Sequence, residues 1–179
     1  MITARILALV FAAATIAAAA DAPIISVREA GGTYTVSAHF TVTEPDALVR
    51  EVLTDYANIP RFMPDVLFSE VLLRQDGYAR VRQEAVSKYL MFSKRVHLVL
   101  DIEESAGAIR FRDRCNESFS VYEGAWTIAR GADVTEITYE LTARPAFSVP
   151  GFVLRKLLDR DAVRMIERLR AEIAARANA

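Results

Sequence analysis

The C-terminal segment, residues 148–179, constrains the fold of this chain more than any other stretch. After Gly151 it contains neither glycine nor proline, so a helix can continue almost to the last residue. Apolar residues recur there at intervals of three and four: Leu154, Leu158, Ala162, Met165, Ile166, Leu169 and Ile173. This spacing places them along one side of a helix with about 3.6 residues per turn. A long one-sided helix needs a broad apolar partner, and the rest of the chain must supply it.

Most of the upstream sequence is predicted to form β-strands. Residues 33–42 alternate apolar and polar side chains, which is typical of a half-buried strand. Further strands are expected over residues 66–74, 78–88, 94–104, 108–115, 118–129 and 134–143. Short turns separate most of these strands and favour antiparallel hairpins. A short helix is expected after Pro45, followed by a segment (55–65) that two prolines interrupt. We therefore expect an α+β fold in which a curved, seven-stranded antiparallel sheet surrounds the long C-terminal helix.

A sheet of this width cannot be covered by one helix. An apolar stripe of about 120° meets only part of such a sheet. The remaining concave surface either collapses onto loops or encloses a cavity, and apolar cavities with a few polar groups bind small molecules. Alternation along the strands predicts an interior that is mostly aliphatic and aromatic, with Gln83, Tyr122 and Tyr139 among its few polar groups.

The first twenty residues are expected to be a secretory signal peptide. They combine a cationic start, an apolar run of about fifteen residues and the small-residue site Ala18-Ala19-Ala20. The alternative is a membrane anchor, but a membrane-spanning helix needs about 20 apolar residues. We expect export to a bacterial periplasm with cleavage near Ala20. An N-terminal segment (21–32) and a single domain (33–176) would follow.

Composition and motifs argue against several classes of function. The net charge of −1 gives no reason to expect nucleic-acid binding. Cys115 is the only cysteine, so an internal disulfide is excluded. The sequence lacks the glycine-rich motifs of nucleotide-binding proteins and the Gly-x-Ser-x-Gly motif of serine hydrolases. His39 and His97 have no companions at metal-ligand spacing, so we expect neither a metal nor another cofactor.

Several stretches resemble a known family. VLTDYANIPRFMPDV (52–66) resembles the start of the polyketide cyclase and coenzyme Q-binding START-like group of the SRPBCC superfamily. YEGAW (122–126) and TEITY (135–139) are similar to its central hairpin, and the two prolines before the C-terminal helix are similar to its ending. The resemblance covers about 33–176 and implies the helix-grip fold around a hydrophobic pocket. Members include aromatase/cyclases, ubiquinone-binding proteins and lipid carriers, so the resemblance does not imply one activity.

The favoured function is binding or carriage of a hydrophobic small molecule, such as an isoprenoid or quinone, a lipid or an aromatic compound. The predicted lining consists of Phe62, Met63, Gln83, Phe111, Tyr122, Trp126, Tyr139 and Leu154. Tyr122, Trp126 and Tyr139 are equally well explained as ordinary core aromatics. Each also carries one polar group that needs a partner when buried, and a ligand can supply it.

A cyclase-like enzyme acting on a ligand in the same cavity is the alternative. Asp113 and Glu123 are the acids on central strands that can face inward, and a buried carboxylate has a raised pKa suited to proton transfer. Tyr139 is the third candidate for such a role. The competing interpretation is that Glu123 pairs on the convex face and Asp113 meets a neighbouring arginine, because buried unpaired charge is costly.

Two apolar stretches are unusual for surface turns. One lies between basic residues near the middle of the chain, and the other directly precedes the long helix. The residues concerned are Tyr89, Leu90, Met91, Phe92, Phe147 and Phe152. One interpretation is a portal at the cavity mouth that contacts a membrane transiently, with cations meeting anionic headgroups. The other is that residues 89–92 continue a strand into the core.

We predict that the mature protein begins at Asp21 or Pro23 and is recovered from the periplasm, because the leader ends in a small-residue cleavage site. Mass spectrometry of the N-terminal peptide from each cell fraction measures this directly. Recovery of soluble cytoplasmic protein with Met1 intact would contradict the prediction.

Overall fold

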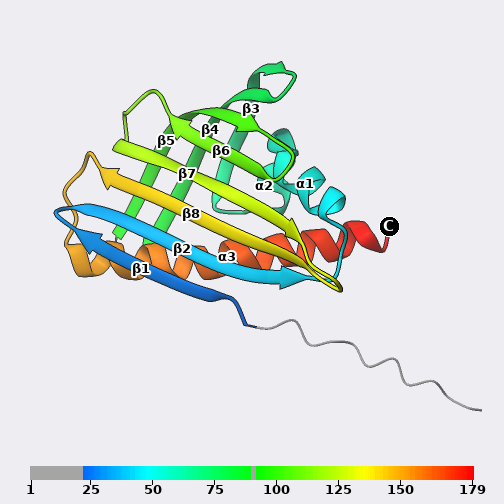
Figure 1. The fold of residues 1–179 in the computed structure, drawn as a ribbon. Coiled ribbons are helices and arrows are strands. Elements are labelled where there is room, and N and C mark those ends of the chain that lie inside the picture. Colours follow the sequence, from blue (N-terminus) through cyan, green and yellow to red (C-terminus); the bar gives the residue numbers. More distant parts are fainter. Residues whose placement is uncertain (1–21, 90–91) are drawn as a thin grey trace, which may run out of the picture.

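A single antiparallel sheet of eight strands curves around one long helix (Figure 1). The computed structural model describes residues 22–89 and 92–179. The strands are β1 (Ile24–Ala30), β2 (Thr33–Val42), β3 (Val66–Gln75), β4 (Tyr78–Tyr89), β5 (Phe92–Glu104), β6 (Ala108–Asp113), β7 (Phe119–Arg130) and β8 (Thr135–Pro145). The helical elements are α1 (Asp46–Thr54), the 3-10 turn η1 (Tyr56–Asn58), α2 (Ile59–Phe62) and α3 (Gly151–Ala177).

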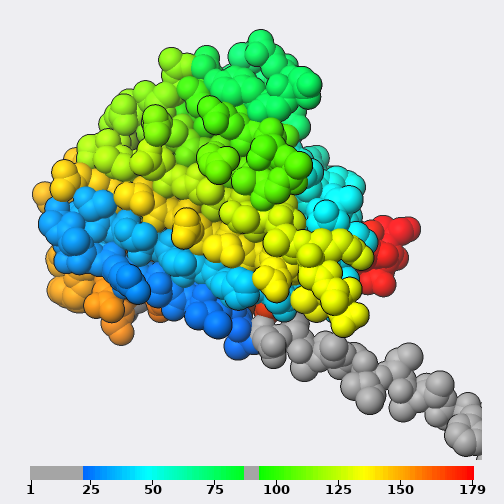
Figure 2. Space-filling model, viewed as in Figure 1, coloured from blue at the N-terminus to red at the C-terminus, as the bar shows by residue number. Residues whose placement is uncertain are grey.

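The order of the strands confirms the predicted architecture. The sheet runs β1-β2-β8-β7-β6-β5-β4-β3, so β3 to β8 form a continuous antiparallel meander. After β8, α3 crosses the concave face of the sheet. Figure 1 shows α3 passing behind the sheet from the β1–β2 turn toward α1. In the same view, Figure 2 shows α3 mainly at its ends, in orange and red, because the sheet covers the rest. The fold is α+β and of the helix-grip type, as expected.

The sheet has one strand more than the seven we predicted. The additional strand, β1, lies in the segment (21–32) that we placed outside the domain. Its periodicity is weak, because Val27 is its only buried residue. A tight turn at Gly31 and Gly32, whose φ values are 58° and 77°, joins it to β2. Hairpin turns with positive φ at both central residues match the natural twist of paired strands, which explains the two glycines.

The two short helices occupy one end of the structure. In Figure 1, α1 and α2 lie beside the C-terminal end of α3. Pro60 falls in the first turn of α2, where a missing backbone N–H costs nothing. The predicted interruption of helix within 55–65 is therefore correct, and the chain resumes as a new short helix after it.

The buried face of α3 differs in detail from the predicted stripe. Its buried residues are Val153, Leu154, Leu157, Ala162, Ile166, Leu169 and Ile173. Leu158 and Met165, which we placed on the stripe, lie in the middle of the same face at about 100° per residue. Both are nevertheless only half-buried. Part of each side chain therefore stays accessible although it lies on the face of α3 that packs against the core.

We predict that Leu169→Asp unfolds the domain, because it places a carboxylate on the sealed face of α3, where Leu169 is 1% exposed. The expected loss is at least about 3 kcal/mol of unfolding free energy, measured by chemical denaturation. Ala171→Asp introduces the same side chain at an exposed position two residues away and is expected to cost less than about 1 kcal/mol. Equal losses for the two variants would show that the face is wrongly assigned.

Candidate ligand-binding site

The centre of the sheet and α3 are held apart. The close backbone approaches of α3 to the sheet are to β1 and β2 on one side and to β4 on the other. The strands between these flanks face α3 through large side chains instead. Phe111, Tyr122 and Trp126 point from β6 and β7 toward the core and are only half-buried. Leu158 and Met165 on the helix are half-buried in the same way.

Six aromatic side chains form a continuous row through this region. Phe147 meets Phe119 with ring centroids 6.0 Å apart, and Phe119 meets Tyr122 at 4.9 Å. Phe111 lies 6.0 Å from Tyr122 and 6.3 Å from Tyr139. Tyr139 and Trp126 form the last pair of the row, with ring centroids 4.4 Å apart. Most of these spacings lie in the range of favourable aromatic pairs. We call Phe147, Phe119, Tyr122, Phe111, Tyr139 and Trp126 the aromatic row.

A glycine makes the middle of the aromatic row possible. Gly124 faces Phe111 across the β6–β7 pair. A Cβ at this position would lie 2.6 Å from the Cζ atom of Phe111 and 2.1 Å from the carbonyl oxygen of Glu140. These distances are below any normal contact, so glycine is needed for the Phe111 ring to lie across β7.

A cavity of about 520 Å³ opens at the outer end of the aromatic row. It is lined by Gly32, Tyr34, Pro145, Phe147, Ser148, Val149, Pro150 and Leu154. We call it the outer pocket. Phe147 belongs to both the outer pocket and the aromatic row, and therefore connects the surface with the interior. The volume of the outer pocket is within the range of about 300–1,000 Å³ that small-molecule sites occupy.

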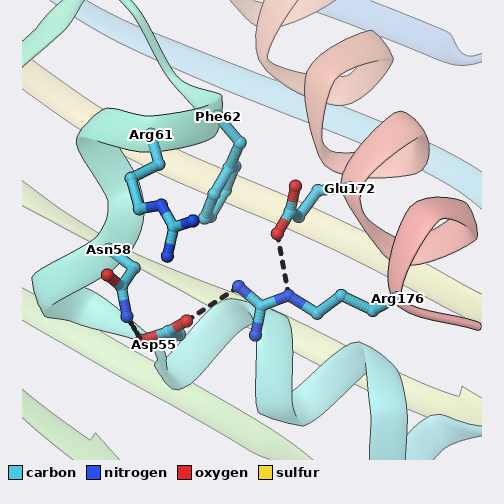
Figure 3. Close-up of a pocket in the computed structure, with 6 residues that line it drawn as sticks. All are labelled: Asp55, Asn58, Arg61, Phe62, Glu172 and Arg176. Atoms are coloured by element: carbon cyan, nitrogen blue, oxygen red, sulfur yellow. Dashed lines mark hydrogen bonds and ion pairs between the residues drawn. The ribbon is translucent and has the colours of Figure 1, made fainter. Parts of the chain in front are cut away.

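A second cavity, of about 380 Å³, lies between α1, α2 and the end of α3 (Figure 3). Its charged groups bind one another. Arg176 donates to Glu172 at 2.8 Å and to Asp55 at 2.7 Å. Burial alone would raise the pKa of Asp55, but hydrogen bonds from Asn58 and Arg176 outweigh it and lower the pKa. These contacts fasten the end of α3 to the short helices, and we call them the ion clasp.

The predicted lining residues divide among these regions. Phe111, Tyr122, Trp126 and Tyr139 lie together in the aromatic row. Leu154 lies in the outer pocket, and Phe62 lies at the ion clasp, where Arg176 stacks 6.0 Å from its ring centre.

The other two lie elsewhere. Gln83 donates to the Ser69 hydroxyl at 3.2 Å, toward the β3 edge of the sheet. Met63, directly after α2, is half-buried against the core. The eight residues therefore lie in several regions of the structure.

Sequence reasoning missed Phe119 because the strand is irregular there. Phe119 and Tyr122 are three residues apart, so simple alternation places them on opposite faces. A register shift between Phe119 and Val121, typical of a β-bulge, brings both rings to the same face. The alternating pattern itself contains no signal of this bulge.

Both candidate catalytic carboxylates already accept hydrogen bonds from other groups of the protein. Glu123 accepts a hydrogen bond from Arg112 Nε at 2.8 Å in a solvent-exposed pair, which fits the convex-face interpretation. Asp113 is buried, but backbone N–H groups of Val99 (2.9 Å) and Asn116 (3.0 Å) hold it, instead of the neighbouring arginine that we expected. It stabilises the turn after β6. Of the three candidate catalytic residues, only Tyr139 lies in the aromatic row.

The two tyrosines of the aromatic row are neutral at physiological pH. Burial is the main cause that raises the pKa of Tyr122 to about 12, with a smaller contribution from the negative charge of Asp113. Burial also raises the pKa of Tyr139 well above its usual range, and the neighbouring Tyr122 adds to this effect. Neither hydroxyl is suited to act as a base, whereas both can donate a hydrogen bond.

The predicted portal residues meet at one end of the structure as far as they are described. Phe152 is 73% exposed on the first turn of α3, and Phe147 lines the outer pocket. Lys94 Nζ lies 4.7 Å from the centre of the Phe147 ring, so the base of the β4–β5 hairpin adjoins this end. Leu90 and Met91, and the side chains of Tyr89 and Phe92, lie outside the described residues. None of the described helices is both long and apolar enough to cross a bilayer.

The two histidines make ordinary polar contacts. His39 Nδ1 lies 3.3 Å from the Thr138 hydroxyl, and His97 Nδ1 lies 3.6 Å from Glu84. Within residues 22–89 and 92–179, no three His, Cys, Asp or Glu side chains gather into a possible metal site.

Comparison with known proteins agrees with this geometry. A family model described as polyketide cyclase / dehydrase and lipid transport matches residues 45–170. A search of curated proteins returned no match. The solved structures described below share less than a quarter of their residues with this chain, so they establish the fold alone.

Three of these structures show the range of the fold. The Zhui aromatase/cyclase from a Streptomyces species is 18% identical, with a TM-score of 0.68 over 81% of this chain and 96% of its own. A START superfamily protein from Mycobacterium smegmatis is 18% identical, with a TM-score of 0.68 over 79% and 97%. A STAR-related lipid transfer protein from Xanthomonas axonopodis is 19% identical, with a TM-score of 0.60 over 86% and 99%.

The family model covers most of the chain, and its match lies within the region that carries the sequence resemblance. The protein belongs to the polyketide cyclase / dehydrase and lipid transport family.

Proposed function

We propose that the protein binds and carries a hydrophobic small molecule between the central strands and α3. The observation that carries this proposal is the half-buried state of side chains at the centre of two facing apolar surfaces. Leu158 and Met165 on α3 and Phe111, Tyr122 and Trp126 on the sheet keep accessible surface, which an internal space between the two would explain. Solved structures with this fold include a lipid transfer protein and an aromatase/cyclase, and both kinds of ligand are largely apolar.

Affinity would come mainly from removing apolar ligand surface from water. Burial contributes roughly 25 cal/mol per Å², so about 200 Å² of apolar surface contributes roughly 5 kcal/mol before ordering costs. The aromatic row offers flat faces for such contacts, which suits a ligand with rings or unsaturated segments. The outer pocket gives the ligand a route from the surface to the row through Phe147.

The same end of the protein is suited to contact a membrane. Phe152 protrudes from the first turn of α3, and Arg155 and Lys156 follow it as exposed cations. Lys94 and Arg95 lie at the adjoining end of β5, both exposed. An apolar tip surrounded by cations matches an anionic bilayer surface, and a ligand could pass there between lipid and the outer pocket.

Binding is favoured over catalysis by the state of the acids. Asp113 is held by backbone N–H groups and Glu123 by Arg112, so neither carboxylate is free to exchange a proton with a ligand. Tyr122 and Tyr139 remain protonated. A cyclase would require one of these groups to be released from its partners. We also propose that carriage takes place in the periplasm, which rests on the N-terminal leader of the sequence.

We predict that Leu158→Trp lowers the affinity for the neutral fluorescent probe N-phenyl-1-naphthylamine at least tenfold. The larger ring fills the internal space that the probe needs, so the melting temperature stays close to that of the native protein. Arg164→Trp, on the exposed side of the same helix, is the matched control and leaves affinity unchanged. If the native protein fails to bind the probe, and Leu158→Trp costs the 1–3 kcal/mol or so of an overpacked core, the internal space is absent.

We predict that Phe152→Ser weakens binding to vesicles containing anionic lipid several-fold, without loss of stability, because the side chain is 73% exposed. Raising the salt concentration should weaken binding of the native protein, since screening acts over about 8–10 Å. Ile24→Ser is the control, because Ile24 is 72% exposed at the far end of β1 from the β1–β2 turn. Equal vesicle binding by both variants, measured by co-sedimentation, would contradict a membrane contact at α3.

A further inference from the structure

We infer that the outer pocket binds the carboxylate end of an amphipathic ligand, which the Tyr34 hydroxyl and the first backbone N–H groups of α3 hold. The apolar tail of the ligand then passes Phe147 toward the interior. This inference rests on the proposed function, since it concerns the entrance to the same internal space. It adds a charged headgroup to a ligand that the apolar contacts define only by its tail.

A buried tyrosine directs its hydroxyl into the outer pocket. Tyr34 is only 5% exposed, and it is one of the residues that line this pocket. A Cβ at Gly151, the first residue of α3, would lie 3.2 Å from the Tyr34 hydroxyl oxygen, so this oxygen lies beside the helix start. Within residues 22–89 and 92–179, the hydroxyl has no hydrogen-bond partner. An enclosed polar group without a protein partner is one that a bound molecule can satisfy.

The start of α3 lacks the negative groups that a helix start prefers. Its N-cap residue is Pro150, which has no side-chain oxygen to cap the helix, and its first turn holds no acidic residue. The exposed cations Arg155 and Lys156 follow instead, although cations are unfavourable near the positive end of a helix dipole. The N–H groups of Gly151 and Phe152 donate to no other group in the described part of the chain. A carboxylate in front of α3 would supply the missing charge and accept these N–H groups.

The Tyr34 hydroxyl is protonated at physiological pH and can therefore donate. Burial is the main cause that raises its pKa above the usual range, and the negative charge of Glu29 adds to this effect. A hydroxyl donates to a carboxylate in a charge-assisted hydrogen bond, which is stronger than a bond between neutral groups. Glu29 itself is exposed, and its Oε1 atom already accepts the N–H group of Gly32 at 2.8 Å.

The charges around the outer pocket favour a single negative charge on the ligand. Lys94 Nζ lies 4.7 Å from the centre of the Phe147 ring, and Arg144 donates to the Gly31 carbonyl at 2.9 Å in the β1–β2 turn. In Figure 1 this turn, the end of β8 and the start of α3 meet at the same end of the structure. The lining residues themselves include neither arginine nor lysine. A phosphate monoester would therefore lack the bidentate guanidinium contacts that suit its charge, whereas a carboxylate needs only the hydroxyl and the N–H groups.

The test compares three probes that share one tail: decanoate, decyl phosphate and the decyltrimethylammonium cation. Each displaces N-phenyl-1-naphthylamine at concentrations below micelle formation, and decanoate is expected to bind most tightly. Tyr34→Phe should weaken decanoate about tenfold, the ratio expected for one lost hydrogen bond to a charged group. It should not weaken the cation, which has no acceptor for the hydroxyl. The melting temperature should stay close to that of the native protein, because the hydroxyl bonds to no described residue.

A second pair of variants tests the charge at the helix start. Ser148 is exposed and lines the outer pocket. Ser148→Glu should weaken decanoate at least fivefold more than Ser148→Gln, because only the glutamate repels the headgroup. The same glutamate should raise the melting temperature, since it complements the dipole of α3, and this rise separates lost binding from lost folding. Tyr78→Phe is the matched control for Tyr34→Phe, because Tyr78 donates to Asp101 on the outer face, and it should leave decanoate binding unchanged.

The possible failures of the two proposals differ. Unchanged decanoate affinity in Tyr34→Phe, or equal effects of Ser148→Glu and Ser148→Gln, would overturn the headgroup site while leaving the carrier proposal intact. Tighter binding of decyl phosphate or of decyltrimethylammonium than of decanoate would overturn the carboxylate assignment in the same way. Failure of the native protein to bind the dye and all three probes would instead overturn the carrier proposal itself.

Discussion

The contact between α3 and the two flanks of the sheet determines the rest of this structure. Eight strands make a surface wider than one helix, and curvature brings β1, β2 and β4 to the helix from opposite sides. The centre of the sheet is then too far away for its backbone to touch α3. Large side chains fill part of that distance, and the proposed function assigns the remainder to a ligand. The aromatic row and the internal space are thus two results of one geometry.

Strong periodicity predicted the elements, and irregular pairing explains what was missed. Alternation placed a strand at 33–42, which coincides with β2, and predicted the long helix that became α3. It missed β1, because an edge strand with one buried residue shows almost no hydrophobic pattern. It also missed Phe119, which a register shift turns inward. These features depend on partner strands, and a single stretch of sequence does not contain that information.

The positions of candidate site residues were predictable where alternation along a strand determines which way a side chain points. They were not predictable where packing between several elements determines it. Phe111, Tyr122, Trp126 and Tyr139 share a face by alternation and lie together. Phe62 lies instead at the ion clasp, because the packing of α2 against the end of α3 carries it there. The partners of Asp113 were equally hidden, since they are backbone N–H groups of β5 and of the turn that follows Asp113. Composition says nothing about such donors.

The order of the strands has a consequence for the way this protein folds. Strands β3 to β8 pair with their sequence neighbours, whereas β2 must find β8 about a hundred residues later, as in the pair Phe40 and Ile137. Contacts between distant segments carry a greater loop-closure cost and tend to form late. The aromatic surface of the meander is therefore exposed until α3, which follows β8 in the chain, closes over it. Under the proposed function, a ligand that occupies this space would favour the closed chain over the open one, and would therefore also stabilise the protein.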